Sequence, residues 1–304
     1  MFLEKFFSVL IFFVIILLSS CSSSDDTPVP EEGISPGIGK MTYFYAPLET
    51  NIEVFYYIPE NFSASTPILF SFHGAQRNAA EYRDALITQA EEMNFIVIAP
   101  EFSQENFPNG SGYNLGNVYT NGNNPTPNTL LPEEEWAFSV VEPLFHHFKQ
   151  ELDNSTPSFH MFGHSAGAQF VHRLLMFQPD LPVDKAVVSA SGWFTFPDSE
   201  VDFPYGIANS PISNMSLHDF FSRRIFIQVG ANDNNPNAAG LRRNALADSQ
   251  GLNRKERSEN YYQFAEGLAE EEDVLFLWSS HVIPDLGHEF VPASKHAVNL
   301  IFEN

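Results

Sequence analysis

The sequence predicts an α/β fold, with a mostly parallel central sheet covered by helices on both faces. Two observations predict it. Short apolar runs rich in β-forming residues alternate with longer segments of helical spacing, which is typical of a parallel sheet. The expected strands are nearly continuous apolar runs, such as FIVIAP at 95–100, which indicates burial on both faces. Since there is no internal repeat and no linker after residue 40, a single domain is expected over residues 41–304.

The expected elements follow from these runs and from turn residues between them. Strands are expected over residues 41–46, 52–59, 67–73, 95–100, 158–163, 185–191, 224–230 and 274–279. Helices are expected over residues 79–93, 131–152, 166–177, 256–270 and 292–302. The first two strands follow each other through a short turn and suit an antiparallel edge. Two long irregular segments remain, 101–131 and 192–222, and loops of this length are often functional.

Composition excludes several classes of protein. The 304 residues carry a formal net charge of -23, so a phosphate backbone would repel the chain and nucleic acid is not an expected partner. The hydrophobic fraction of 43% is enough for a sizeable core, which argues against disorder over most of the chain. The single cysteine, Cys21, excludes an intramolecular disulfide and a cysteine metal site.

The first forty residues indicate export. Residues 1–20 have a weakly basic start and an apolar run that is short for a membrane span, which predicts a signal peptide. The sequence LSSC at 18–21 resembles the lipobox of bacterial lipoproteins. That resemblance implies a lipid on Cys21 and a membrane anchor in the cell envelope outside the cytoplasm, on the periplasmic side or the cell surface. An ordinary secretory signal is the alternative. Residues 21–40 are rich in Ser, Pro, Gly and acidic residues, which predicts a flexible tether.

The sequence GHSAG at 163–167 lies between an expected strand and an expected helix. In this context G-x-S-x-G predicts a sharp turn that points the hydroxyl of Ser165 away from the sheet, with small neighbours that let strand and helix approach closely. The start of the helix also offers free backbone N–H groups to a developing oxyanion. Ser165 is therefore the expected nucleophile, and a glycine-rich turn without chemistry is the alternative.

A second turn, HGA at 73–75, ends the third expected strand about ninety residues before the serine. The two turns together resemble the arrangement in α/β-hydrolases, in which the turn after this strand carries a second oxyanion donor. The two expected donors are the backbone N–H groups of Ala75 and Ala166. We expect His73 to be a hydrogen-bonded structural residue at the strand end.

The acid and the base of such a site follow the serine in the chain. Asp233 comes just after the strand 224–230, which places it at the same sheet edge as Ser165, and it is the expected acid. His288 follows a flexible glycine in the loop before the last helix and is the expected base. The alternatives are Asp198 and Asp248 for the acid, and His281 and His296 for the base.

Together these motifs resemble the α/β-hydrolase superfamily over most of residues 41–304. HGAQRN with Tyr82-Arg83-Asp84, and GHSAGAQF, resemble the polyhydroxybutyrate-depolymerase-like and feruloyl-esterase-like bacterial esterases. The resemblance implies a single α/β-hydrolase domain and a Ser-His-Asp triad that cleaves carboxylic esters, small or polymeric, through an acyl-enzyme. A serine peptidase of the same fold and a non-catalytic surface-binding lipoprotein are the alternatives.

The two long loops are expected to form the walls of the substrate pocket, with Tyr113 and Trp193 as candidate contacts. A local hydrophobic core under the loops is an equal alternative. No cofactor and no metal are expected. Residues 233–237 resemble the start of a calcium loop, but Ala238 replaces its glycine and Asn244 its closing glutamate. The oligomeric state stays open.

Overall fold

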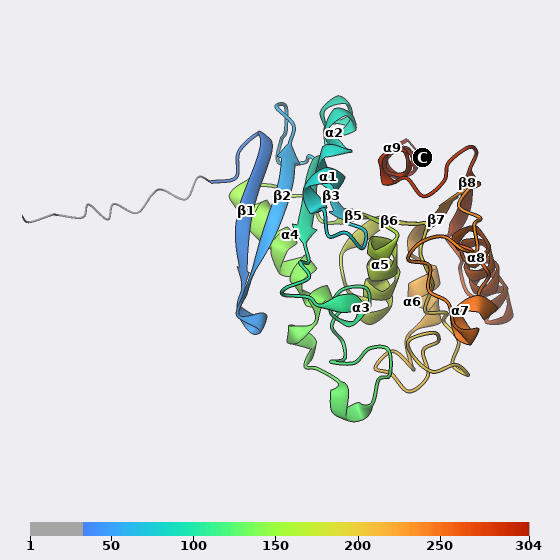
Figure 1. Cartoon of the computed structure of the whole chain (residues 1–304). Helices are drawn as coiled ribbons and strands as arrows, with labels where there is room; N and C mark the ends of the chain where they lie inside the picture. Colours follow the sequence, from blue (N-terminus) through green and yellow to red (C-terminus); the bar gives the residue numbers. More distant parts are fainter. Residues whose placement is uncertain (1–32, 304) are drawn as a thin grey trace, which may run out of the picture. The chain divides into compact units, whose positions relative to one another are not determined.

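The computed structural model describes residues 33–303 of the chain. Within these residues eight strands form one sheet in the order β1-β2-β4-β3-β5-β6-β7-β8 (Figure 1). The strands are β1 (Gly37–Tyr45), β2 (Thr50–Ile58), β3 (Ile68–Phe72), β4 (Ile96–Glu101), β5 (Phe159–His164), β6 (Val183–Ser189), β7 (Arg224–Gly230) and β8 (Ser279–Ile283). Strands β3 to β8 run parallel, whereas β2 pairs antiparallel with both β1 and β4. The predicted parallel sheet with an antiparallel edge is confirmed.

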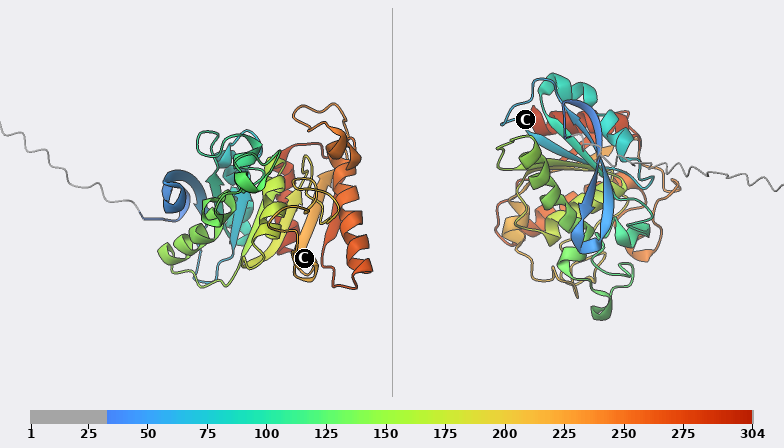
Figure 2. Two further views of the ribbon diagram at one scale, coloured as in Figure 1. Left: turned by 90° about the horizontal axis from the view of Figure 1, so that it is seen from below. Right: turned by 90° about the vertical axis from the view of Figure 1, so that its left-hand side faces the viewer.

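Helices cover both faces of the sheet, as Figure 1 shows. One face carries α1 (Ala79–Asp84), α2 (Ile87–Met93) and α9 (Phe290–Phe302), and the other carries α4 (Val141–Glu151), α5 (Ala166–Phe177), α6 (Leu217–Phe221) and α8 (Arg254–Glu271). The short helices α3 (Asn109–Gly112) and α7 (Ala245–Ser249) belong to the long loops. Strand β1 and helix α8 lie at opposite ends of the sheet (Figure 2).

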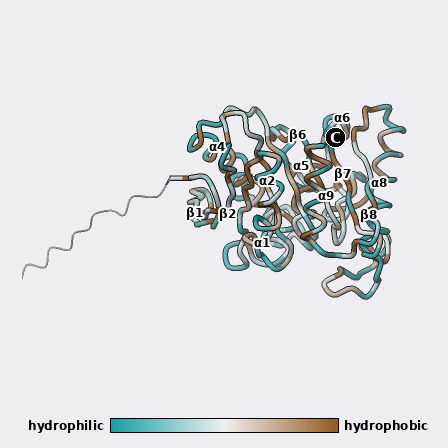
Figure 3. Tube along the Cα trace, turned by 90° about the horizontal axis from the view of Figure 1, so that it is seen from above, coloured by the Kyte–Doolittle hydropathy of each residue, from teal (hydrophilic) through white to brown (hydrophobic). Residues whose placement is uncertain are grey.

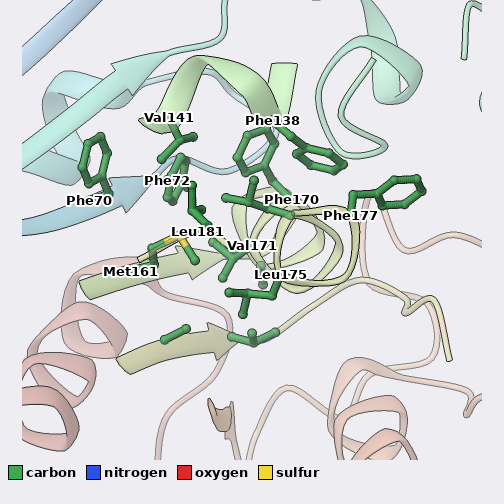
Figure 4. Close-up of a cluster of buried hydrophobic side chains, with 14 of the residues drawn as sticks. Phe70, Phe72, Phe138, Val141, Met161, Phe170, Val171, Leu175, Phe177 and Leu181 are labelled. Atoms are coloured by element: carbon green, nitrogen blue, oxygen red, sulfur yellow. The ribbon is translucent and has the colours of Figure 1, made fainter. Parts of the chain in front are cut away.

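Helix α5 is the centre of the larger core. All twelve of its residues are buried, because it packs on β3, β5 and β6 and is covered in turn by loops. Phe170 of α5 stacks on Phe72 of β3 with 4.9 Å between ring centroids, and Figure 4 shows these rings beside Phe138 and Val171. Figure 3 shows the same arrangement as hydrophobic central strands within hydrophilic outer segments. The helix that begins at the expected nucleophile is therefore held firmly in place.

Three expected boundaries are wrong. The last strand was expected over residues 274–279, but β8 is Ser279–Ile283, because the apolar side chains before it, such as Trp278, pack on α6 and α8 instead of pairing with β7. Of the helix expected over 131–152, only α4 is α-helical, and Glu133–Glu135 and Ala137–Val140 form 3-10 turns separated by an extended Trp136. The first strand begins at Gly37, so residues 37–40 belong to the sheet edge and not to the tether.

The expected signal peptide, the candidate lipidation site Cys21 and most of the expected tether lie outside the described residues. Within residues 33–303, none of the helices combines the length and the apolar character that a membrane crossing needs.

Candidate active site

Ser165 occupies a strained turn between β5 and α5. Its backbone has φ 56° and ψ -112°, a conformation that non-glycine residues rarely adopt and that costs on the order of 1–3 kcal/mol. The turn needs small neighbours: a Cβ on Gly163 would overlap the carbonyl oxygen of Gly167, and a Cβ on Gly167 would overlap that of Phe72. The Ser165 N–H donates to the carbonyl of Ser189 at 2.9 Å, which ties the turn to β6. The strand–turn–helix geometry expected for G-x-S-x-G is confirmed.

In the structure the side chains of Ser165, His288 and Asp233 form a series of hydrogen-bond contacts, with His288 in the middle. Nε2 of His288 lies 3.1 Å from Oγ of Ser165, and Nδ1 of the same ring lies 2.6 Å from Oδ2 of Asp233. Asp233 is 5% exposed, whereas the hydroxyl-bearing Ser165 and the ring of His288 are half-buried. The serine can thus be reached from solvent while the carboxylate behind the histidine is shielded.

Backbone pairing between two loops places the acid beside the base. The loop after β7 and the loop after β8 are joined by Ala231 N–H to Ile283 carbonyl at 2.9 Å and by Asn232 N–H to Leu286 carbonyl at 2.8 Å. This approach requires Gly230, because a Cβ there would overlap the Leu286 carbonyl oxygen. The parallel pairing of β7 with β8 therefore carries both loops to the same edge of the sheet.

The alternative acids and bases are engaged elsewhere. Asp248 pairs with Arg243 and Arg257, and Asp198 accepts the N–H of Glu200. His281 bonds Oγ of Ser279 at 2.8 Å, and His296 is exposed on α9. Neither alternative histidine is hydrogen-bonded to Ser165.

A buried arginine, which the sequence gave no reason to single out, completes the surroundings of Asp233. Nη1 of Arg254, in the first turn of α8, lies 3.4 Å from Oδ1 of Asp233, and the two side chains are 5% and 3% exposed. The N–H of Lys255 donates to the Asp233 carbonyl at 3.1 Å. Because a buried carboxylate is costly without a counter-charge, the nearby guanidinium of Arg254 compensates for the burial of Asp233.

The turn after β3 lies against the serine. A Cβ on Gly74 would lie 3.9 Å from Cβ of Ser165, and the following Ala75 is exposed. Ala166 is the first residue of α5, so its N–H has no acceptor within the helix. Arg77 holds the turn by donating to the carbonyls of Phe107 at 3.1 Å and Asn109 at 2.9 Å, among other acceptors. The turn that carries Ala75 therefore lies against Ser165, and the first N–H of α5 next to Ser165 has no acceptor in the helix.

His73 has the structural role that was expected for it. The N–H of Phe102 donates to its Nε2 at 3.1 Å, and its Nδ1 lies 2.9 Å from the carbonyl of Gly74. Burial lowers the pKa of His73 to about 3, so the ring is neutral at physiological pH. These bonds join the ends of β3 and β4.

Tyr113 and Trp193 do not lie where a substrate contact was expected. Tyr113 is fully buried, and its hydroxyl donates to the carbonyl of His73 at 2.8 Å, so it supports β3 from behind. Trp193 is 4% exposed, with the guanidinium carbons of Arg173 and Arg242 at 4.1 Å and 4.5 Å from its ring. For both residues the alternative of a local core under the loops describes the structure.

The site opens directly to the surface. Four surface cavities of the described residues, of about 180 to 400 Å³, are lined by other residues, and none of them includes Ser165, Asp233 or His288. In residues 33–303, no group of three or more His, Cys, Asp or Glu side chains has the arrangement of a metal site.

Comparison with solved structures identifies the class of protein. The chain is similar to poly(aspartic acid) hydrolase-1 from Sphingomonas sp. KT-1, with 33% identity and a TM-score of 0.81 over 88% of this chain and 99% of that one. It is similar to LpqC, a poly(3-hydroxybutyrate) depolymerase from Bordetella parapertussis, with 27% identity and a TM-score of 0.79 over 88% and 91% of the two chains. The siderophore hydrolase EstB from Aspergillus nidulans shares the fold alone, at 14% identity and a TM-score of 0.53 over 89% and 95%.

No protein-family model and no curated protein sequence matches the chain. The fold and the similar structures define a hydrolase. The chain belongs to the α/β-hydrolase family, and the resemblance to depolymerase-like bacterial esterases that its motifs suggested is confirmed.

Proposed function

We propose that the protein is a serine esterase that cleaves carboxylic esters with Ser165 as nucleophile, His288 as base and Asp233 as the orienting acid. The observation that carries the proposal is the unbroken line of contacts from Ser165 Oγ through the His288 ring to Asp233, at 3.1 Å and 2.6 Å. A nucleophile, a base within hydrogen-bond reach and a third group that orients the base are what acyl transfer requires.

The reaction follows from the geometry. His288 takes the proton from Ser165 Oγ as the oxygen attacks the ester carbonyl, and the resulting oxyanion accepts hydrogen bonds from the N–H groups of Ala75 and Ala166. His288 then gives the proton to the departing alcohol, which leaves an acyl-enzyme. Water, activated by the same histidine, attacks the acyl group and releases the acid. Asp233 holds the Nδ1–H tautomer of His288 and stabilises its protonated form without taking the proton.

A polymer is the substrate that the open site favours. The half-buried Ser165 and the exposed Ala75 leave room for a chain to cross the surface, and the similar structures at 33% and 27% identity are named for hydrolysis of polymers. A neutral polyester suits this protein better than poly(aspartic acid), because the formal net charge of -23 repels a polyanion.

The test compares the wild type with Ser165→Ala on p-nitrophenyl butyrate and on a poly(3-hydroxybutyrate) film. The variant is expected to fold normally, to lose essentially all turnover and to escape labelling by a fluorophosphonate probe. Retained turnover, or an unlabelled wild type, contradicts the assignment; an unlabelled wild type favours a binding protein.

Hydrolysis of amide bonds is a second candidate, favoured by the 33% identity to a poly(aspartic acid) hydrolase, whose named substrate is an amide-linked polyanion. Poly(aspartic acid) and an aminoacyl p-nitroanilide separate the candidates. Turnover of poly(aspartic acid) that rises with salt indicates a substrate held back by the negative field, since salt screens exposed charges. Turnover of the amides above that of the esters overturns the esterase assignment.

We also propose that a lipid on Cys21 anchors the enzyme in the cell envelope. Support comes from the LSSC sequence alone. In the native host or another bacterium that processes lipoproteins, Cys21→Ser should move the protein from the membrane fraction to the soluble fraction. An unchanged membrane fraction contradicts the anchor.

A further inference from the structure

Tyr82, on α1, lies behind the candidate active site and contacts three of its loops. Its hydroxyl lies 3.2 Å from Nδ1 of His164, the residue before the nucleophile. A Cβ on Gly74, in the turn after β3, would lie 3.0 Å from the same hydroxyl oxygen. Its ring stacks on Phe290, two residues after the expected base, with 4.3 Å between centroids and 9° between planes. One side chain thus touches the loops that carry the oxyanion donor, the nucleophile and the base.

Burial fixes the protons of this cluster. Tyr82 is 3% exposed, and burial raises the pKa of its hydroxyl, against the opposite effect of a backbone hydrogen bond from Gly74. Burial, with the charges of His288 and Arg254 nearby, lowers the pKa of His164 well below its usual value. The tyrosine is therefore protonated and the histidine neutral, so an uncharged hydrogen bond joins the Tyr82 hydroxyl to Nδ1 of His164 while the same oxygen faces the Gly74 backbone.

The turn that Tyr82 touches has to be held accurately. An oxyanion donor is effective only when its N–H is aimed at the position that the oxyanion takes in the transition state. Ala75 and the next residue, Gln76, are exposed, so packing does not hold the tip of this turn. Arg77 fixes one end of the turn on the 102–109 loop, and His73 bonds the Gly74 carbonyl. The Tyr82 hydroxyl contacts Gly74 on the side that also faces Ser165.

We propose that Tyr82 is a positioning residue whose hydroxyl couples the Gly74–Ala75 turn to the turn at His164–Ser165 and thereby aims the Ala75 N–H at the oxyanion. The proposal rests on the proposed function, because it assigns Tyr82 a part in the same acyl transfer. It is distinct from a packing role, since the ring alone would serve packing against Phe290.

The variant Tyr82→Phe removes the hydroxyl and keeps the ring. It should lower kcat on p-nitrophenyl butyrate about tenfold while KM changes by less than about twofold, since the substrate ester carries no oxyanion. A trifluoromethyl ketone, whose adduct with Ser165 places an oxyanion in the site, should lose affinity by the same factor as kcat/KM. The matched control is Tyr57→Phe, which removes a hydroxyl bonded to Glu91 at 2.7 Å and to no residue of the site. It should leave kcat and ketone affinity unchanged.

A second variant, His164→Phe, removes the other partner of the same hydrogen bond. If this hydrogen bond is responsible for the effect, the double variant Tyr82→Phe/His164→Phe should be no less active than the less active of the two single variants. Both changes then break one and the same interaction, so their effects do not add. Labelling of Ser165 by a fluorophosphonate should persist in every variant, although more slowly.

Three results overturn the inference: wild-type kcat in Tyr82→Phe, a loss of kcat without loss of ketone affinity, or an equal loss in the Tyr57→Phe control. In each of these the wild type is still labelled at Ser165, so the proposed function stands and only the role of Tyr82 falls. An unlabelled wild type overturns both.

Discussion

Acid should destabilise this protein through His73, whose hydrogen bonds allow only a neutral ring. The N–H of Phe102 points at Nε2, so that nitrogen carries no proton, and Nδ1–H donates to the Gly74 carbonyl. A second proton on Nε2 would set two donors against each other inside the core. Burial, the largest cause, accordingly lowers the pKa of His73 from 6.5 to about 3.

The magnitude follows from this shift. Because the folded pKa lies below the unfolded one, His73 contributes its full stability above pH 6.5 and loses it as the pH falls towards 3. Lowering the pH from 8 to 5 crosses about 1.5 units of that window, which at 1.36 kcal/mol per unit costs about 2 kcal/mol of unfolding free energy. In a chain of this size such a loss lowers Tm by roughly 4–8 °C. His172, buried with the same pattern of bonds, has a pKa shifted in the same direction and adds to the loss.

Urea unfolding at pH 8 and pH 5 measures the effect of His73. The variant His73→Gln cannot titrate, so its stability should fall by about 2 kcal/mol less between the two pH values than that of the wild type. The comparison is made within each variant, so a lower stability of His73→Gln at pH 8 does not disturb it. His146→Gln, at an exposed position on α4, is the matched control and should behave like the wild type. The same pH dependence in His73→Gln and wild type would refute the reasoning.

Three further predictions concern the site. Asp233→Asn should lower kcat for ester hydrolysis by about 10³–10⁴ with little change in fold, because the amide cannot hold the required tautomer of His288. An activity within tenfold of the wild type would contradict the role proposed for Asp233. Arg254→Met should lower the unfolding free energy at pH 7 by about 3–5 kcal/mol, since it leaves the Asp233 carboxylate buried without its counter-charge, and Arg254→Lys should recover part of it. Equal stability of Arg254→Met and wild type in urea contradicts a stabilising buried pair. Gly167→Ala should destabilise the protein by more than about 2 kcal/mol and slow fluorophosphonate labelling of Ser165, because the new Cβ would overlap the Phe72 carbonyl oxygen. A wild-type labelling rate would show that the backbone of the turn shifts to accommodate the methyl group.

The residues that the sequence singled out and that the structure brings together are those marked by their place at the end of a strand. Ser165, Asp233 and His288 follow β5, β7 and β8, and parallel strands end at one edge of the sheet, so local order along the chain was sufficient to bring them together. The error in the eighth strand did not affect the placement of His288. The loop with His288 follows the strand both in the expected position, 274–279, and in the observed one, Ser279–Ile283.

The sequence did not predict whether the aromatic residues of the long loops contact substrate or are buried. Tyr113 and Trp193 occur in loops whose composition suits a pocket wall and a buried core equally well. Only the packing of those loops distinguishes the two, and it buries both side chains.

By itself, the sequence determined the class of fold and the sharp turn at Ser165, and it predicted that Asp233 and His288 lie at the same edge of the sheet. Apolar periodicity and the small residues around Ser165 act over a few positions, so they can be read locally. Only the tertiary structure decided that Arg254 neutralises Asp233, 21 positions away, and that Tyr82 meets His164 across 82 positions. Such contacts depend on how α8 and α1 dock against the end of the sheet, and no local pattern of residues encodes a docking angle.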